Sequence, residues 1–189
     1  ERVMRTPNAA VLQRILDSAA ELFGERPFHE VTMDDIAKHA NTSKGSIYAR
    51  FKSKEDLYLG LIVYFGEQLR SDIQAKTAPS ESPYHRLLVL IQEVLRFHDR
   101  YPYFLELVQR AEVICRGNEQ LTENRRKFVA LISDTLVAFH PSTSNNLELS
   151  AAALMGMTRA ILQATPVPRD DKIPEWVVNH FLFGFARKC

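Results

Sequence analysis

The chain has 189 residues, of which 46% are hydrophobic and 25% are charged, and its formal net charge is +1. This composition is that of an ordinary globular protein; it excludes a disordered chain and a collagen-like repeat, and the length allows a sizeable core. The two cysteines, Cys115 and Cys189, have neither the number nor the spacing of a disulfide framework or a zinc site.

No stretch approaches the roughly 18 consecutive apolar residues that a membrane span requires, and residues 1–11 lack the apolar block of a signal peptide. We therefore expect a soluble protein in the reducing environment of the cytoplasm. The small net charge does not decide whether the protein binds nucleic acid, because the positions of the charges matter more than their sum.

Apolar residues recur with helical spacing along the chain, and we find no convincing alternation of the kind that predicts a sheet. The pattern predicts an all-α fold of about nine helices. In chain order, the expected helices cover residues 7–23, 33–40, 44–51, 53–77, 84–99, 102–116, 119–139, 146–164 and 174–187.

The second and third expected helices are short and lie close together. Thr32 precedes the second helix, with Asp35 at capping-box spacing, and Ser43 precedes the third. Residues 41–43 favour a turn, and the small Ala37 allows the two helices to cross closely. This pattern is typical of a helix-turn-helix, whose second helix enters the major groove of DNA.

A local block of positive charge covers the same region. Residues 36–54 contain no aspartate or glutamate. Their basic side chains are Lys38, Lys44, Arg50, Lys52 and Lys54. By itself such a block is as compatible with a solvated surface as with a nucleic-acid contact. Its coincidence with the predicted helix-turn-helix favours DNA.

The runs TMDDIAKHA, SKGSIY and FKSKEDL between Thr32 and Leu57 resemble the DNA-binding domain of the TetR family of transcriptional regulators, and residues 15–23 resemble that family's first helix. The resemblance covers about the first third of the chain. It departs from the usual pattern at Asn41-Thr42, where the family has glycine and a hydrophobic residue, and at Pro27, where glycine is common. Asn41 tolerates the same backbone geometry, whereas Thr42 affects which operator is preferred.

The resemblance implies a DNA-binding regulator, usually a repressor, that binds palindromic operator DNA as a homodimer and is released by a small, mostly apolar effector. It implies a DNA-binding domain at residues 1–52, an effector-binding and dimerisation domain at 53–189, and no cofactor or metal. We extend the implied DNA contacts with two residues from the charge pattern, Arg50 and Lys52, and with two from the turn, Thr42 and Ser43. The full set is Thr32, Thr42, Ser43, Lys44, Gly45, Ser46, Tyr48, Arg50, Lys52 and Lys54.

We expect the dimer interface in the last two helices. Small residues recur there at a spacing of four, which allows a partner helix to approach, and the final helix is more apolar than one amphipathic helix needs. The alternative is that both helices bury these residues against their own core. The expected interface residues are Ala152, Gly156, Ala160, Ala164, Trp176, Val177, Phe181 and Phe185.

An effector pocket is expected among the helices between residues 57 and 139, because aromatic side chains beside a few polar groups suit an apolar ligand. Residues of this kind belong to the core more often than they contact a ligand. The candidates are Tyr64, Phe65, Phe97, Tyr101, Phe104, Val108, Glu112 and Phe128.

The sequence contains no Gly-x-Ser-x-Gly, His-Glu-x-x-His, Cys-x-x-Cys or glycine-rich phosphate motif, so we do not expect an enzyme. His98-Asp99 lacks a nearby nucleophile. Cys115 is either a buried structural thiol or a redox sensor. The alternative function from another class is a dimeric interaction or ligand-binding module that does not bind specific DNA.

Overall fold

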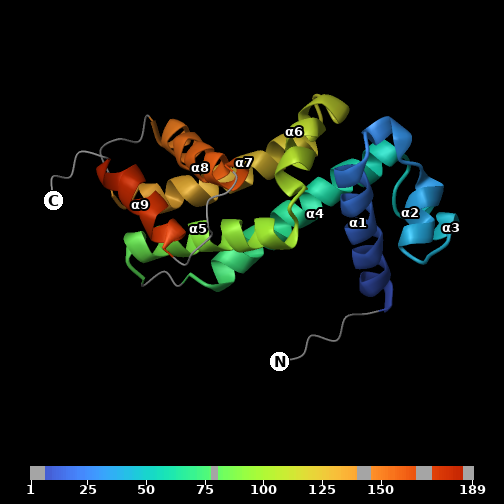
Figure 1. Cartoon of the computed structure of the whole chain (residues 1–189), viewed down its shortest axis with the longest axis horizontal. Helices are drawn as coiled ribbons and strands as arrows, with labels where there is room; N and C mark the ends of the chain where they lie inside the picture. Colours follow the sequence, from blue (N-terminus) through green and yellow to red (C-terminus); the bar gives the residue numbers. More distant parts are fainter. Residues whose placement is uncertain (1–6, 78–80, 140–145, 165–171, 185–189) are drawn as a thin grey trace. The chain divides into compact units, whose positions relative to one another are not determined.

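The computed structural model describes residues 7–77, 81–139, 146–164 and 172–184. Within these residues the fold is all-helical, as predicted, and has no strand (Figure 1). The elements are α1 (Pro7–Glu25), the 3-10 turn η1 (Phe28–Glu30), α2 (Met33–His39), α3 (Lys44–Tyr48), α4 (Lys54–Ala75), α5 (Pro83–Arg100), α6 (Phe104–Ile114), α7 (Glu119–Leu136), α8 (Leu147–Gln163) and α9 (Ile173–Phe183).

Several helices are shorter than expected, and the early ends of two of them have a clear local cause. The helix predicted over 44–51 ends at Tyr48, because the chain turns there to begin the next cap: the amide of Lys52 donates to Asp56 Oδ2 at 2.7 Å. The last helix, predicted to reach 187, ends at Phe183, where Gly184 adopts a positive φ of 67°. A positive φ favours glycine and takes the chain out of the helix.

The chain forms two compact units, one made of residues up to 65 with 101–122, and one made of 66–100 with residues from 123 onward. This division differs from the expected boundary between residues 52 and 53. The first unit also takes in the start of α4 and all of α6, because α6 packs against α1. Arg110 on α6 donates to the carbonyl of Phe23 on α1 at 2.8 Å.

Three aromatic rings form the centre of the first unit. Phe23 and Tyr58 have ring centroids 4.9 Å apart, and Phe28 lies 5.5 Å from each of them. Tyr58 is completely buried, and its hydroxyl donates to the carbonyl of Leu107 at 2.9 Å. Burial raises the pKa of Tyr58 far above its ordinary value of 10.0. The cluster therefore connects α1, η1, α4 and α6.

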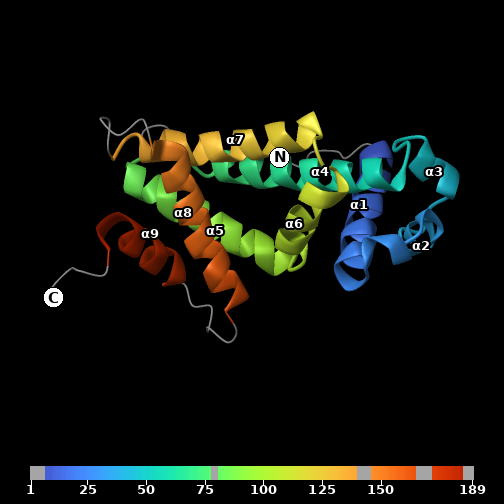
Figure 2. The ribbon, with the colours of Figure 1, turned by 90° about the horizontal axis from the view of Figure 1, so that it is seen from above.

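In the second unit α9 packs against both α5 and α8 (Figure 2). The hydroxyl of Tyr84 on α5 donates to Asn179 Oδ1 on α9 at 3.1 Å. Glu93 on α5 is only 5% exposed, and its carboxylate accepts from Lys76 Nζ at 2.6 Å and from Arg96 Nη1 at 2.7 Å. The buried carboxylate of Glu93 is thus paired with two cations, as burial of a charge requires. None of the helices in the described part of the chain has the length and apolar character needed to cross a membrane.

Tyr58→Phe should lower the free energy of unfolding by about 1–2 kcal/mol, because the buried carbonyl of Leu107 loses its donor. The measurement is the urea midpoint followed by circular dichroism. Tyr48→Phe is the matched control, since Tyr48 is 48% exposed and its hydroxyl is open to water. Equal midpoints for the two variants would show that the Tyr58 hydroxyl does not stabilise the first unit.

Candidate nucleic-acid interface

The first helix of the predicted helix-turn-helix begins at a reciprocal cap. Thr32 Oγ1 accepts from the amide of Asp35 at 3.1 Å, and Asp35 Oδ2 accepts from the amide of Thr32 at 3.0 Å. These bonds to Thr32 hold the pKa of Asp35 below its ordinary value of 3.8. The capping box predicted from the sequence is confirmed, and it fixes where α2 starts.

The turn after α2 depends on Asn41. Its φ of 47° lies in the left-handed region, and no other non-glycine residue in the described segments has a positive φ. Asparagine tolerates this conformation better than most residues. The amide of Thr42 then donates to the carbonyl of Ala37 at 2.9 Å. The prediction that Asn41 supplies the turn geometry is confirmed, and the chain reverses into α3.

The second helix of the motif, α3, is held by its cap and by two apolar side chains. Ser43 Oγ accepts from the amide of Ser46 at 3.0 Å, and Ile47 is completely buried. Phe51, which follows α3, packs onto Gly60 of α4: a Cβ at position 60 would lie 2.6 Å from Phe51 Cε1. A glycine at position 60 therefore lets the ring reach the α4 backbone.

Five of the predicted DNA-binding residues share one groove, which has a volume of about 420 Å³. They come from the starts of α2 and α4, from α3 and from the loop between α3 and α4. The groove is lined by Val31, Thr32, Met33, Asp34, Lys44, Tyr48, Lys52, Ser53 and Lys54. The tertiary structure thus brings hydroxyl and ammonium groups together at the N-termini of two helices, an environment that attracts anions.

The other predicted residues lie along α3 and its ends. Ser43 and Gly45 are exposed, while Thr42, Ser46 and Arg50 are half-buried. Arg50 Nη1 donates to the carbonyl of Ser46 at 2.7 Å, which satisfies one of the last carbonyls of the short helix. Arg50 therefore has a structural contact in addition to its predicted role.

Lys54 is an anchor of the local fold. Its Nζ donates to the carbonyls of Phe28 and Val31, both at 2.8 Å, and lies 4.4 Å from the centre of the Phe28 ring. The sequence predicted a DNA contact for Lys54, and in the unbound protein this ammonium also ties the start of α4 to η1. Its positive charge nevertheless remains at one end of the groove.

Sequence reasoning missed the carboxylate in this groove. Lys44 Nζ lies 2.7 Å from Asp34 Oδ2, and the ion pair joins α3 to α2. The two residues are ten positions apart on different helices, so no helical spacing signals the contact. The Asp34 carboxylate raises the pKa of Lys44 above its ordinary value of 10.5.

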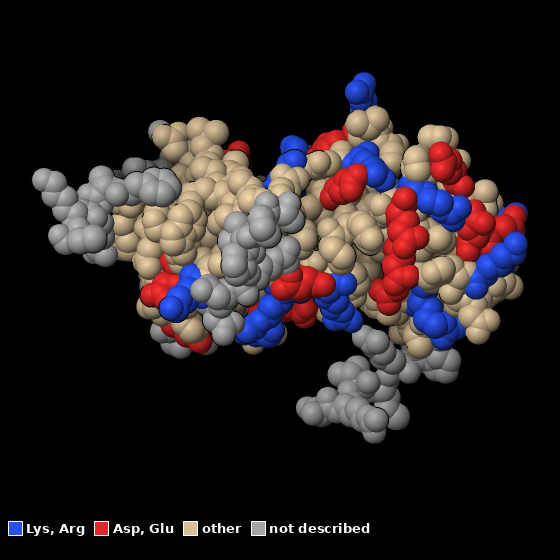
Figure 3. Space-filling model, viewed as in Figure 1, with Lys and Arg blue, Asp and Glu red and all other residues tan. Residues whose placement is uncertain are grey.

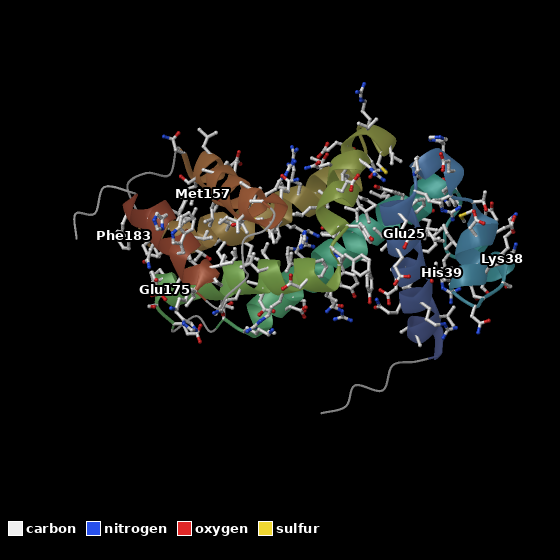
Figure 4. All side chains as sticks on the ribbon, in the orientation of Figure 1. Glu25, Lys38, His39, Met157, Glu175 and Phe183 are labelled. Carbon is white, nitrogen blue, oxygen red and sulfur yellow. The ribbon has the colours of Figure 1, made fainter. Side chains whose placement is uncertain are left out.

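Acidic and basic side chains alternate over the region of α1 and α2 (Figure 3). His39, on the side of α2 toward α1 in Figure 4, lies 3.4 Å from Glu21 Oε2 of α1, and Arg26 lies 3.7 Å from Asp35 Oδ2. Each contact joins α2 to α1 or to the residues just after it. Neither contact involves a residue that lines the groove.

The predicted dimer residues of α8 lie on the surface. Ala152, Gly156, Ala160 and Ala164 are all exposed. On α9, Trp176 is 44% exposed and Phe181 is half-buried, but Val177 is 0% exposed. Val177 packs into the core of its own chain, which corrects its assignment to the interface, and Phe185 lies outside the described residues.

Two further apolar residues on this surface were not predicted: Leu149 is 70% exposed and Phe183 is 47% exposed. Met157 and Phe183 are marked on α8 and α9 in Figure 4, and most of the side chains visible over these helices in Figure 3 are uncharged. A cavity of about 440 Å³ lies between the end of α7, the start of α8 and Phe181 and Leu182 of α9. Exposed apolar patches of this kind mark contact surfaces.

The predicted effector residues do not form one group. Phe65 is completely buried and lies 5.6 Å from Tyr64, 4.4 Å from Tyr101 and 5.9 Å from Phe104, measured between ring centroids. Within this group Phe65 is a core residue. Val108 is half-buried on α6.

The remaining effector candidates separate from that cluster. Phe97 and Phe128 belong to the second unit. Glu112 is exposed on α6, so it does not line an interior pocket, because the helix turns it to solvent. Neither the groove at Lys44 nor the cavity at Phe181 contains an effector candidate.

Cys115 is buried, and its Sγ lies 3.9 Å from the carbonyl of Glu55. Burial raises the pKa of this thiol, which disfavours the reactive thiolate. Among the residues whose placement is described, no three histidine, cysteine, aspartate or glutamate side chains gather in a way that could hold a metal ion.

Thr32→Ala should lower the free energy of unfolding by about 1 kcal/mol, since one side of the cap of α2 is lost. It should also raise the pKa of Asp35 toward 3.8, which carboxyl NMR measures. Because the folded pKa is lowered, the carboxylate stabilises the fold above pH 3.8, and this stabilisation is lost as the pH falls through the folded value. An unchanged pKa of Asp35 would contradict the role of the Thr32 hydroxyl.

Comparison with known proteins agrees with this geometry. Residues 15–61 match the sequence model of the family described as "Bacterial regulatory proteins, tetR family". The fatty acid metabolism regulator protein of Bacillus subtilis is 30% identical over 121 residues, which are 55% of this chain and 60% of that protein. The uncharacterized HTH-type transcriptional regulator Rv1255c of Mycobacterium tuberculosis is 38% identical over 92 residues, 49% of this chain and 45% of that protein.

The matches therefore span from about half to 60% of the length of these curated relatives. Among solved structures, a TetR-like transcriptional regulator from Rhodococcus sp. RHA1 superposes with a TM-score of 0.74 at 25% identity, over 97% of this chain and 100% of that chain. Residues 15–61, which include the helix-turn-helix, thus match the tetR family of bacterial regulatory proteins, and the fold over nearly the whole chain resembles that of a TetR-like transcriptional regulator.

Proposed function

We propose that this chain is a transcriptional regulator that reads a palindromic operator as a homodimer, and that it acts as a repressor. The observation that carries the proposal is the groove at the starts of α2 and α4, because five residues predicted from the sequence to bind DNA line it. Such a concentration of lysine and hydroxyl groups beside a short, capped helix fits the phosphates flanking a major groove.

We call the helix-turn-helix, with α1 and the start of α4, the head. The role of each predicted DNA-binding residue in the head follows from its position. Thr32 and Lys54 stand at helix N-termini, where partial positive charge favours a phosphate. Lys44 and Tyr48 lie on α3, the helix that would enter the major groove. A Cβ at Gly45 would meet nothing closer than Ser43 Oγ, at 3.8 Å, so the fold itself does not require glycine there. Its absent side chain serves close approach of the DNA backbone.

Two heads are needed because a single short helix reads too few bases to be specific. The exposed small residues of α8, next to the exposed Trp176 and Leu149, offer a surface for a second copy. A stripe of small side chains lets two helices approach closely, and the flanking apolar side chains supply the area to be buried.

The effector is proposed to be small and mostly apolar. The name of the Bacillus subtilis relative, which is a fatty acid metabolism regulator, supports an apolar ligand. Fatty acids and their thioesters are therefore the first compounds to test for release of the bound operator.

The proposal is tested by selecting genomic DNA fragments with the purified protein at two salt concentrations and mapping the bound site. A palindrome whose affinity falls as salt rises supports a dimeric DNA reader. A folded, dimeric protein that selects no sequence would overturn the proposal in favour of an interaction module.

Lys44→Ala should weaken binding to the selected palindrome on the order of tenfold and make its salt dependence shallower, because fewer phosphates are neutralised. Fluorescence anisotropy across a salt series measures both. Lys127→Ala is the control, since it also removes an exposed lysine paired with a glutamate, but on α7. If Lys44→Ala and Lys127→Ala bind alike, α3 is not the reading surface.

Gly156→Leu should disrupt the dimer while leaving the protomer folded. No atom lies within 4 Å of a Cβ built at Gly156, so the side chain is tolerated by its own chain but obstructs an approaching helix. Sedimentation velocity should show a dimer for the parent, a weaker one for Gly156→Ala and a monomer for Gly156→Leu, with unchanged circular dichroism. A Gly156→Leu dimer as tight as the parent would place the interface elsewhere.

A further inference from the structure

The groove at the reading head contains one residue whose charge opposes DNA. Among the described residues that line it, Lys44, Lys52 and Lys54 are basic and Asp34 is the single acid. Asp34 is in the first turn of α2, where its negative charge suits the helix dipole. The same carboxylate pairs with Lys44, the lysine expected to reach a phosphate, so it competes with DNA for that ammonium.

Asp34 also holds the lysine that is expected to contact DNA. Lys44 Nζ donates to Asp34 Oδ2 at 2.7 Å, and the side chains of the two residues are 48% and 56% exposed. An ion pair this open to water is weak, because solvent and salt screen it. A phosphate arriving in the groove is therefore able to displace the carboxylate.

We propose that Asp34 restrains Lys44 in the unbound head and thereby sets its affinity for DNA below what the basic residues alone would give. The inference rests on the proposed function and assigns Asp34 as a positioning residue of the same surface. In the unbound protein Asp34 accepts from Lys44; in the complex the ammonium transfers to a phosphate and the carboxylate is left to counterions.

The replacement of Asp34 by a phosphate as the partner of Lys44 changes how strongly DNA binding depends on salt. A lysine that binds a phosphate releases a cation condensed on the DNA. When Lys44 leaves Asp34, the freed carboxylate attracts a cation from solution, which offsets part of that release. Removal of the carboxylate should therefore make binding both tighter and more sensitive to salt.

The test compares the parent with Asp34→Asn, Asp34→Glu, Lys44→Ala and the double variant, on the selected palindrome and on a scrambled duplex. Asp34→Asn should bind both duplexes tighter by about two- to fivefold per head, the range expected for an exposed ion pair. Its slope of log affinity against log salt should steepen by up to about one per head. Asp34→Glu keeps the charge and should bind like the parent.

Glu25→Gln is the matched control, because Glu25 is an exposed acid on α1 outside the groove and its loss changes the net charge equally. It should leave affinity unchanged. Thermal melting of each variant shows whether α2 remains folded. In the Lys44→Ala background, Asp34→Asn should give no further gain.

The measurements distinguish a failure of the Asp34 proposal from a failure of the proposed function. If the parent shows no preference for any sequence, the proposed function fails. If the parent binds its palindrome and Lys44→Ala weakens it, but Asp34→Asn binds like the parent, the restraint is wrong and the function stands. A gain from Asp34→Asn that persists without Lys44 would also overturn it, since the carboxylate would then act only through its field.

Discussion

A helix of five residues is not stable by itself, since nucleation costs more than so few hydrogen bonds return. The whole head depends on how α3 is braced despite that limit. Ser43 Oγ accepts from the amide of Ser46, Ile47 of α3 is buried, and Phe51 packs on Gly60 of α4. Rigidity therefore comes from the neighbours of α3, and its outer side is left to polar groups.

The lysines of the head are also held in place by neighbouring residues. Lys54 is tied to two carbonyls and to the Phe28 ring, and Lys44 is tied to Asp34, so the cations that could meet DNA are already placed before any ligand arrives. Prior placement lowers the entropy lost when a flexible lysine is immobilised on binding. The price is a competing partner for Lys44, which a phosphate must replace.

The C-terminal helix α9 packs on α5 and α8 within its own chain and still leaves apolar area exposed. Val177 and Val178 are fully buried, whereas Trp176 and Phe183 remain partly open. One helix thus has a core-facing side and an outer side, both apolar. The many hydrophobic residues of the helix indicate that more than one side is apolar, but they do not indicate which side faces the core.

Local chemistry determined most of the helix-turn-helix: the Thr32–Asp35 cap, the turn at Asn41 and the Ser43 cap are interactions between residues at most five positions apart, and all were predicted from residue type and spacing. The all-helical class followed from periodicity in the same way. The tertiary structure alone decided the pairing of Lys44 with Asp34, the anchoring of Lys54 and the burial of Val177 and Phe65. These depend on which helix packs beside which, and that choice is made by contacts between residues far apart in the chain, which no local pattern records.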